Sequence, residues 1–245
     1  MSVLIAIDQG TTSTRTVAYD KDLNIVYSEQ QEYSLQYPQD GWVEIDPLEL
    51  MQSVYGTLDP VLNSCPQITG VGITNQRETT LVWDADSGEP IYNAIVWQDR
   101  RTADECLRLK EAGFEKSIKT KTGLLLDPYF SATKISWILD NVQGARAKAD
   151  KGKLRFGTVD TFLLWQLSEG SIFKTDVTNA SRTNIYNIHA KEWDDDLLKI
   201  FNVPRSMLPE VHASDASFGM FERNNKNLKI TGVIGDQQSA LVGQR

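Results

Sequence analysis

The chain has 245 residues, of which 40% are hydrophobic and 24% are charged, a composition typical of folded globular proteins rather than disordered or fibrous ones. Its formal net charge of -8 at pH 7 repels nucleic acid and anionic lipid, which argues against a polyanion-binding role. No stretch approaches the roughly 18 apolar residues of a membrane-spanning helix, and no secretory leader follows Met1.

Cysteine and histidine are scarce, which limits redox and metal chemistry. Cys65 and Cys106 lie far apart in the sequence, and His189 and His212 do not make a clustered set of zinc ligands. Unpaired cysteines are typical of a reducing compartment. We therefore expect a cytoplasmic protein with no nucleic-acid partner and no membrane span.

The N-terminal part of the chain is predicted to be rich in strands, with one helix among them. That helix is expected to begin at Asp46 and Pro47, because Asp suits the N-cap and Pro the first helical position, and Pro60 predicts a break or kink. Short β-rich runs bounded by turn residues predict strands at Val3–Ile7, Thr16–Tyr19, Ile25–Tyr27, Thr69–Thr74, Thr80–Trp83 and Ile91–Trp97.

The remainder of the chain alternates helices with strands. A buried strand over Leu228–Ile234 leads into a helix over Asp236–Val242, for which Asp236 is the predicted N-cap. Strands mixed with helices throughout predict an α/β fold. Apolar residues at helical spacing, and one β-rich run, predict the other elements, which are helices at Thr102–Ala112, Ser131–Asn141 and Thr161–Leu167 and a strand at Leu154–Val159.

The segment that joins the first two strands is polar and rich in hydroxyl groups. Backbone N–H groups and the hydroxyls of Thr11, Thr12 and Ser13 can face a polyphosphate, and Arg15 adds positive charge. Asp8 can hold Mg²⁺ directly or through water. The segment matches neither a Walker loop nor a dinucleotide-binding motif. The structural alternative is a hairpin whose side chains satisfy only their own turn.

Two further segments could line a small polyol. Arg77 and Glu78 place a donor beside an acceptor, which suits a vicinal diol, although neighbours on a strand share one target only at its end or at a bend. Trp97 could offer a flat apolar wall, and Tyr129 a hydroxyl group. The alternatives are a solvated surface pair and ordinary aromatic packing.

Asp236 follows a buried strand that ends in Gly235. Ligands of open α/β sheets bind beyond the carboxyl ends of the strands. A carboxylate there can accept the proton of an attacking hydroxyl, as phosphoryl transfer requires. The alternative is a helix N-cap with a purely structural role.

Six segments, in this order, resemble motifs of the glycerol kinase branch of the carbohydrate kinases, a family with the actin-like ATPase fold. The run at Arg77–Thr79 and the run at Trp97–Arg100 point to glycerol, whereas related pentulose kinases share the first polar segment and the Gly-Asp segment. The resemblance extends from Asp8 to the end of the chain. The six segments are Asp8–Ser13, Asn75–Thr79, Ile95–Arg100, Gly157–Thr161, Thr178–Thr183 and Gly235–Gln238.

This resemblance implies a ribonuclease H-like (actin-like ATPase) α/β domain with a mixed β-sheet flanked by helices. Residues 1–245 would form the N-terminal glycerol-binding domain, and the C-terminal nucleotide-binding domain would be absent from this sequence. The implied reaction is ATP-dependent phosphorylation of glycerol to glycerol 3-phosphate with Mg²⁺. The full-length protein would be a homo-oligomer, either a dimer or a tetramer, and this half alone would be poorly active or inactive.

The resemblance also implies roles for individual residues. Asp236 would be the general base, and Trp97 one hydrophobic wall of the pocket. Asp8 would lie on the Mg²⁺ side of the ATP phosphates. The hydrogen bonds to glycerol would come from Arg77, Glu78, Tyr129, Asp236 and Gln237. The contacts to the ATP phosphates would come from Thr11, Thr12, Ser13 and Arg15.

Two other functions remain open from the sequence. The first is a kinase for another polyol or for a pentulose, which would share the phosphate-binding segment and the base. The second is a non-catalytic module that binds a polyol, which would keep the pocket but need no base.

Overall fold

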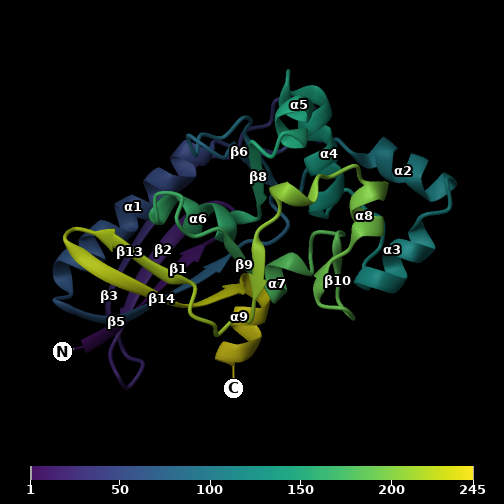
Figure 1. The fold of residues 1–245 in the computed structure, drawn as a ribbon. Coiled ribbons are helices and arrows are strands. Elements are labelled where there is room, and N and C mark those ends of the chain that lie inside the picture. Colours follow the sequence, from purple (N-terminus) through teal and green to yellow (C-terminus); the bar gives the residue numbers. More distant parts are fainter. Residues whose placement is uncertain (1, 245) are drawn as a thin grey trace.

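Six strands form the central sheet of the computed structural model, which describes residues 2–244. They are β1 (Ser2–Gln9), β2 (Ser13–Tyr19), β3 (Ile25–Glu32), β5 (Gln67–Asn75), β13 (Gly219–Arg223) and β14 (Lys226–Gly235). Their order across the sheet is β13-β14-β5-β1-β2-β3. The β1–β5 and β5–β14 pairs are parallel and the other neighbours are antiparallel, so the sheet is mixed (Figure 1).

One face of this sheet packs against helices α1 (Pro47–Ser64) and α6 (Val159–Leu167). Side chains alternate between the two faces along a strand, so Val3, Ile5 and Ile7 are buried in the core beneath these helices. Leu4 lies on the opposite face and is 45% exposed. On that face the last helix, α9 (Asp236–Gly243), contacts β5 and β14.

Helix α1 begins where the sequence predicts and extends further than expected. The Asp46 side chain caps it by accepting a backbone N–H of the first turn at 2.8 Å, and Pro47 occupies that turn. The predicted break at Pro60 is wrong, because α1 continues to Ser64. Proline removes one hydrogen bond of the helix, and burial of neighbours such as Leu58 against the sheet offsets that loss.

A second core lies beside the sheet, on the side of Figure 1 away from the N-terminus. Strands β6 (Leu81–Asp84) and β8 (Leu154–Gly157) form an antiparallel pair between the two cores. Trp83 packs into the sheet core, whereas Val82 packs into the second core. The helices around the second core are α2 (Ala103–Glu111), α3 (Glu115–Thr122), α4 (Ser131–Asn141), α5 (Ala145–Asp150) and α8 (Asp195–Ile200).

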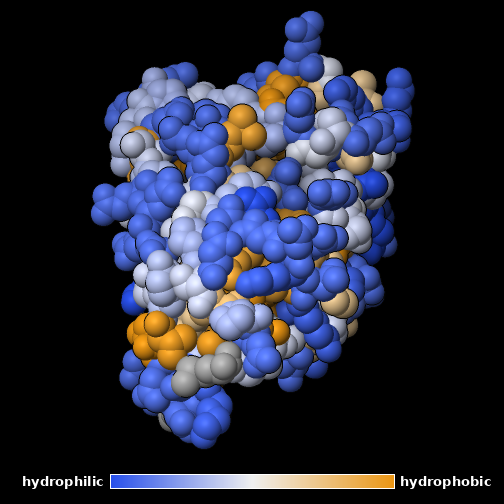
Figure 2. Space-filling view, turned by 90° about the vertical axis from the view of Figure 1, so that its left-hand side faces the viewer, coloured by the Kyte–Doolittle hydropathy of each residue, from blue (hydrophilic) through white to orange (hydrophobic). Residues whose placement is uncertain are grey.

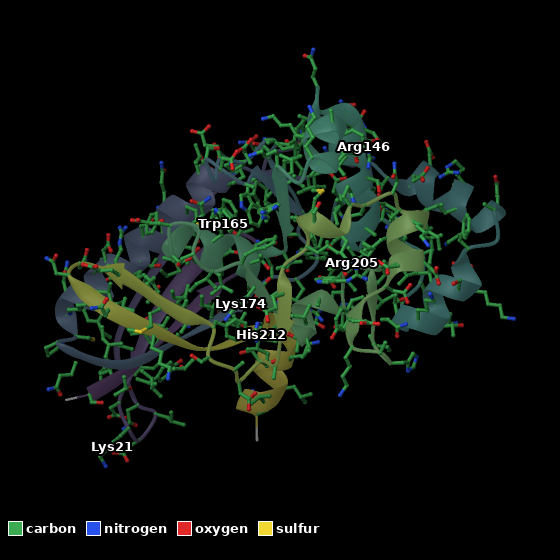
Figure 3. All side chains as sticks on the ribbon, viewed as in Figure 1. Lys21, Arg146, Trp165, Lys174, Arg205 and His212 are labelled. Atoms are coloured by element: carbon green, nitrogen blue, oxygen red, sulfur yellow. The ribbon has the colours of Figure 1, made fainter. Side chains whose placement is uncertain are left out.

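Short elements connect the two parts. Strands β9 and β12 pair in parallel, and Lys174 and His212 mark them in Figure 3. A helix of four residues, α7, follows β9 directly and lies against β14. The short elements are β4 (Glu44–Ile45), β7 (Ala94–Ile95), β9 (Lys174–Asp176), α7 (Val177–Ala180), β10 (Tyr186–Asn187), β11 (Glu192–Trp193), the 3₁₀ helix η1 (Arg205–Met207) and β12 (Glu210–His212).

The α/β prediction is confirmed, and the predicted strand at Ile91–Trp97 is mostly wrong. Only Ala94–Ile95 forms a strand, β7, which pairs with β4. Before it, the chain turns back on β6, where the Ile91 N–H donates to the Val82 carbonyl at 3.0 Å. This turn leaves too few residues in register for a longer strand.

The surface and the cysteines are those of an ordinary folded domain. Figure 2 shows one face of the molecule, on which hydrophilic residues predominate and hydrophobic residues form small separate patches. Within residues 2–244, no helix has both the length and the apolar character needed to cross a bilayer. Cys65 and Cys106 are buried and unpaired.

The packing of α1 makes a prediction about stability. Leu58 is completely buried, so Leu58→Ala should lower the free energy of unfolding by about 3 kcal/mol through lost burial and the cavity left behind. Leu48 belongs to the same helix and is 60% exposed, so Leu48→Ala should change it by less than about 0.5 kcal/mol. Urea denaturation measures both, and equal effects would contradict this packing.

Candidate active site

Three parallel strands end together at one edge of the sheet. Gln9 at the end of β1 and Gly235 at the end of β14 both pair with Asn75 at the end of β5. The segment after β5 is tied to the turn after β1, because the Gln76 side-chain amide donates to the Gly10 carbonyl at 2.9 Å. Residues that follow the three strands therefore meet at the edge where α/β sheets bind ligands.

Arg77 and Asp236 meet at this edge. The Arg77 Nε donates to a carboxylate oxygen of Asp236 at 3.2 Å, and a terminal nitrogen of Arg77 donates to Gln238 at 3.3 Å. Arg77 is only 5% exposed, while the Asp236 side chain is 44% exposed. Gly235 makes room for this arrangement, because a Cβ there would lie 2.5 Å from the Arg77 Cδ. The contact thus requires a residue without a side chain.

Glu78 lies at a sharp bend after β5. Its φ of 61° is in the left-handed region, which is unfavourable for a residue with a side chain and recurs at functional sites. The bend is held by the Thr79 N–H, which donates to the Arg77 carbonyl at 2.7 Å, and by the Ser131 hydroxyl, which donates to the Glu78 carbonyl at 2.9 Å. Arg77 and Glu78 therefore lie at a bend, which the sequence requires if the two side chains are to share one target.

The Glu78 carboxylate is buried and paired with Arg182. Glu78 is 1% exposed, and the Arg182 Nε donates to it at 2.5 Å. Burial raises the pKa of Glu78, the Asp236 charge adds to this rise, and the charges of Arg182 and Arg77 oppose it. Arg182 was not predicted as a site residue. It lies within the Thr178–Thr183 segment, so that motif was the available signal.

Trp97 and Tyr129 form an aromatic pair near these charges. Their ring centroids are 5.4 Å apart with an interplanar angle of 54°. The guanidinium of Arg182 lies 5.9 Å from the Tyr129 ring centroid. Trp97 also donates its indole N–H to the Thr11 hydroxyl at 3.0 Å. The structure therefore brings Trp97, Tyr129 and the first polar turn together.

The loop in the predicted phosphate-binding segment is shorter than the sequence indicates. β1 extends through Gln9 and β2 begins at Ser13, so only three residues make the turn. The Gly10 N–H donates to the Ser13 carbonyl across this turn at 2.9 Å. Thr12 is exposed, whereas Thr11 is partly buried against Trp97. The segment is a tight hairpin with hydroxyl groups at its tip.

Asp8 and Arg15 face each other across this hairpin. They are directly paired in the antiparallel register, and both are exposed. Reduced hydration raises the pKa of the Asp8 carboxyl, the negative charge of Asp236 raises it further, and Arg15 opposes both. The two carboxylates are thus close enough to repel each other.

The start of α9 differs in detail from the prediction. The N-cap is Gly235, and Asp236 is the first helical residue, whose carboxylate accepts the Gln237 N–H at 2.7 Å. The helix begins one residue earlier than a cap at Asp236 requires, so the predicted N-cap is wrong by one position. Gln237 is exposed, and Gln238 is the glutamine that contacts Arg77.

A network of polar side chains around α7 is hydrogen-bonded to Gly235. This network was not predicted from the sequence. Asn75 and Asn179 exchange side-chain hydrogen bonds at 2.9 and 3.1 Å. Asp176 caps α7 and accepts the Thr178 hydroxyl at 2.7 Å. That hydroxyl oxygen accepts the Gly235 N–H at 2.8 Å. The position of the strand end, and hence of the helix after it, is fixed by these bonds.

The Arg182–Glu78 pair generates a prediction about protonation. Arg182→Met should raise the pKa of Glu78 further, because the buried carboxylate would lose its main positive partner. Carbon-13 NMR titration of labelled glutamate carboxyls measures this. Arg108→Met is the matched control, since Arg108 pairs with the exposed Glu105 on α2. An unchanged Glu78 titration in Arg182→Met would contradict the described pairing.

Comparison with known proteins places the chain in a family. The profile of the FGGY family of carbohydrate kinases, N-terminal domain, matches residues 3–243. Glycerol kinase of Alteromonas mediterranea is 56% identical over 98% of this chain and 50% of its own length. Glycerol kinase of Petrotoga mobilis is 53% identical over the same shares. The chain spans about half the length of the curated relatives it matches.

Solved structures agree with this assignment. The crystal structure of Plasmodium falciparum glycerol kinase with ADP superimposes with a TM-score of 0.94 and 38% identity, and covers 100% of this chain and 50% of that one. Xylulose kinase of Lactobacillus acidophilus shares the fold, with a TM-score of 0.89 and 22% sequence identity. That superposition covers 99% of this chain and 50% of the xylulose kinase chain. The predicted actin-like ATPase fold, with its mixed sheet flanked by helices, is confirmed. The chain belongs to the FGGY family of carbohydrate kinases.

Proposed function

We propose that this chain is the N-terminal, glycerol-binding domain of a kinase that phosphorylates glycerol to glycerol 3-phosphate with ATP. The observation that carries the proposal is the hydrogen bond between Arg77 and Asp236, which joins the segments after β5 and β14, with the buried Glu78 next to Arg77 in the chain. The relatives at more than 50% identity named as glycerol kinases support the same substrate. A C-terminal domain would supply the rest of the nucleotide site.

The proposed chemistry starts with two hydroxyl groups of the polyol. Arg77 donates to one oxygen and Glu78 accepts from its neighbour, so a diol satisfies both buried groups. Trp97 covers the carbon skeleton, with Tyr129 packed beside it and its hydroxyl directed to the polyol. The pairing with Arg182 favours the charged form of Glu78, which is the form that accepts two hydrogen bonds.

Asp236 is proposed as the general base. It is partly exposed, so a substrate hydroxyl has access to it, and Arg77 orients its carboxylate. Gln237, at the exposed start of α9, would add a hydrogen bond to glycerol. The base takes the proton of the attacking hydroxyl as the phosphoryl group transfers, and most of the catalysis is positioning and charge stabilisation.

The hairpin tip is proposed to bind the ATP phosphates. Backbone N–H groups and the hydroxyls of Thr11, Thr12 and Ser13 would contact phosphate oxygens, and Arg15 would add positive charge. Within residues 2–244 no group of three or more His, Cys, Asp or Glu side chains could hold a metal ion alone. Mg²⁺ commonly takes one or two carboxylates and completes its shell with phosphate and water, so Asp8 fits that role.

When bound, Mg²⁺ would neutralise charge that develops on the transferring phosphate. We further infer a cytoplasmic location, which the two unpaired buried cysteines support. A dimer or tetramer of the full-length protein, and low activity of this half alone, stay predictions from the family resemblance.

The role of Asp236 has a direct test. In the full-length protein, Asp236→Asn should lower kcat at least about 100-fold, because the amide cannot accept the proton, while calorimetric glycerol affinity changes far less. Asp195→Asn is the control, since Asp195 makes an exposed ion pair on α8 with Arg205 and should keep full activity. Retained kcat in Asp236→Asn would reject Asp236 as the general base, whereas glycerol binding without turnover by the unmodified full-length protein would favour a non-catalytic polyol-binding module.

Substrate choice separates glycerol from its rivals. A coupled ATP assay on the full-length protein with glycerol, longer polyols and a pentulose should give the highest kcat/KM for glycerol. We expect this preference because the donor of Arg77 and the acceptor of Glu78 match the two hydroxyl groups of one diol. The aromatic pair of Trp97 and Tyr129 lies beside them. A higher kcat/KM for the pentulose would reject glycerol as the substrate.

A further inference from the structure

Lys134 on α4 is completely buried, although lysine is almost always exposed. Its ammonium donates to three consecutive carbonyl oxygens, those of Pro128, of Tyr129 at 3.0 Å and of Phe130 at 3.4 Å. An ammonium has three N–H donors, so each of them has a partner in this arrangement. A buried charge is tolerated only when it is hydrogen-bonded in this way.

The three carbonyls belong to the turn that carries Tyr129. On its other side, the turn is held by Asp127, which accepts the Tyr129 N–H at 2.9 Å. The rings of Tyr129 and Phe130 lie beneath the guanidinium of Arg182, at 5.9 and 5.0 Å from their centroids. Lys134 therefore fixes the backbone of this turn from inside the protein, and Arg182 contacts its rings.

An apolar residue at position 134 would cost less to bury. Its neighbour Ile135, and Ile138 and Leu139 one turn further along α4, are buried in the second core. An uncharged side chain there would leave three carbonyl oxygens of the turn without a donor, and each unpaired buried polar group is unfavourable. The hydrogen bonds of Lys134 to the turn at residues 128–130, rather than apolar packing, thus explain why a lysine is buried at this position.

We propose that Lys134 is a positioning residue of the polyol pocket, which sets the Tyr129 turn against Trp97 so that the two aromatic side chains form one wall. This inference rests on the proposed function only for the identity of the ligand. Lys134 does not touch the substrate. It acts through the backbone of residues 128–130.

The charge on Lys134 is sensitive to pH near neutrality. Burial lowers its pKa to about 7, while the facing groups Asp99, Glu78, Cys106 and Asp127 partly oppose that shift. Asp99 is paired with Arg101, Glu78 with Arg182 and Asp127 with Arg100, and burial raises the pKa of Cys106 to about 11.

Each of the three carboxylates near Lys134 therefore has an arginine partner. As the pH rises through about 7, Lys134 loses one of its three N–H donors. One carbonyl of the turn then lacks a partner, so the Tyr129 turn should loosen on the alkaline side.

The test uses the full-length protein labelled with 5-fluorotryptophan, in which the fluorine-19 resonance of Trp97 is identified by its loss in Trp97→Phe. Lys134→Met keeps the length of the side chain and removes all three donors. The Trp97 resonance should shift or broaden in this variant without any ligand. In the unmodified protein it should titrate with a midpoint at about 7, and this titration should be absent from Lys134→Met.

Glycerol kinetics supply the second readout. Lys134→Met should raise the KM for glycerol at least about tenfold while kcat falls much less, because the pocket wall moves and the base does not. The matched control is Ile138→Val, which removes one buried methylene from the same helix and should leave both KM and the Trp97 resonance unchanged.

The outcomes separate this inference from the proposed function. A Trp97 resonance that is unmoved in Lys134→Met overturns the positioning role, and a resonance that is independent of pH in the unmodified protein overturns the proposed pH dependence. If Lys134→Met fails to fold, Lys134→Gln takes its place, because it keeps at most two of the three N–H donors; an unmoved Trp97 resonance in that variant also overturns the positioning role. Absence of glycerol turnover by the unmodified protein would instead reject the proposed function, and the resonance would still report on Lys134.

Discussion

The parallel pairing of β1, β5 and β14 is the constraint on which the rest of the site depends. It brings Gln9, Asn75 and Gly235 into line, although they lie far apart in the sequence. Arg77 and Glu78 follow the end of β5, and Asp236 follows the end of β14, by only a few residues. The Arg77–Asp236 contact joins positions 159 residues apart, so the sheet register, rather than any local motif, creates the site.

Charge balance at this edge explains several otherwise unfavourable features. A buried carboxylate at Glu78 is costly unless it is paired, and Arg182 and Arg77 supply the opposite charge. The left-handed backbone at Glu78 costs about 1 to 3 kcal/mol in typical cases, and the Glu78 carboxylate accepts a hydrogen bond from Arg182. Such features persist where the surrounding structure fixes them, and here hydroxyl and amide hydrogen bonds do so.

Much of this was predictable from local sequence, and the rest depends on distant contacts. The hairpin, the start of α1 and the need for a bend at Arg77–Glu78 follow from turn, cap and alternation rules, and all are found. The break predicted at Pro60 is absent because tertiary packing overrides a local helix breaker. The motif at Thr178–Thr183 contains Arg182 without naming its partner Glu78, and nothing in the local sequence marks Lys134 as buried. Their importance appears only once the chain is folded.

The central claim is that one small polyol meets Arg77, Glu78 and Asp236 together. A crystal structure of the full-length protein with glycerol and a non-hydrolysable ATP analogue tests this most directly. The account predicts one glycerol hydroxyl within hydrogen-bond distance of the Asp236 carboxylate, its neighbour between Arg77 and Glu78, and the carbon chain against Trp97. Glycerol bound away from the ends of β5 and β14, with Asp236 still paired only to Arg77, would contradict it.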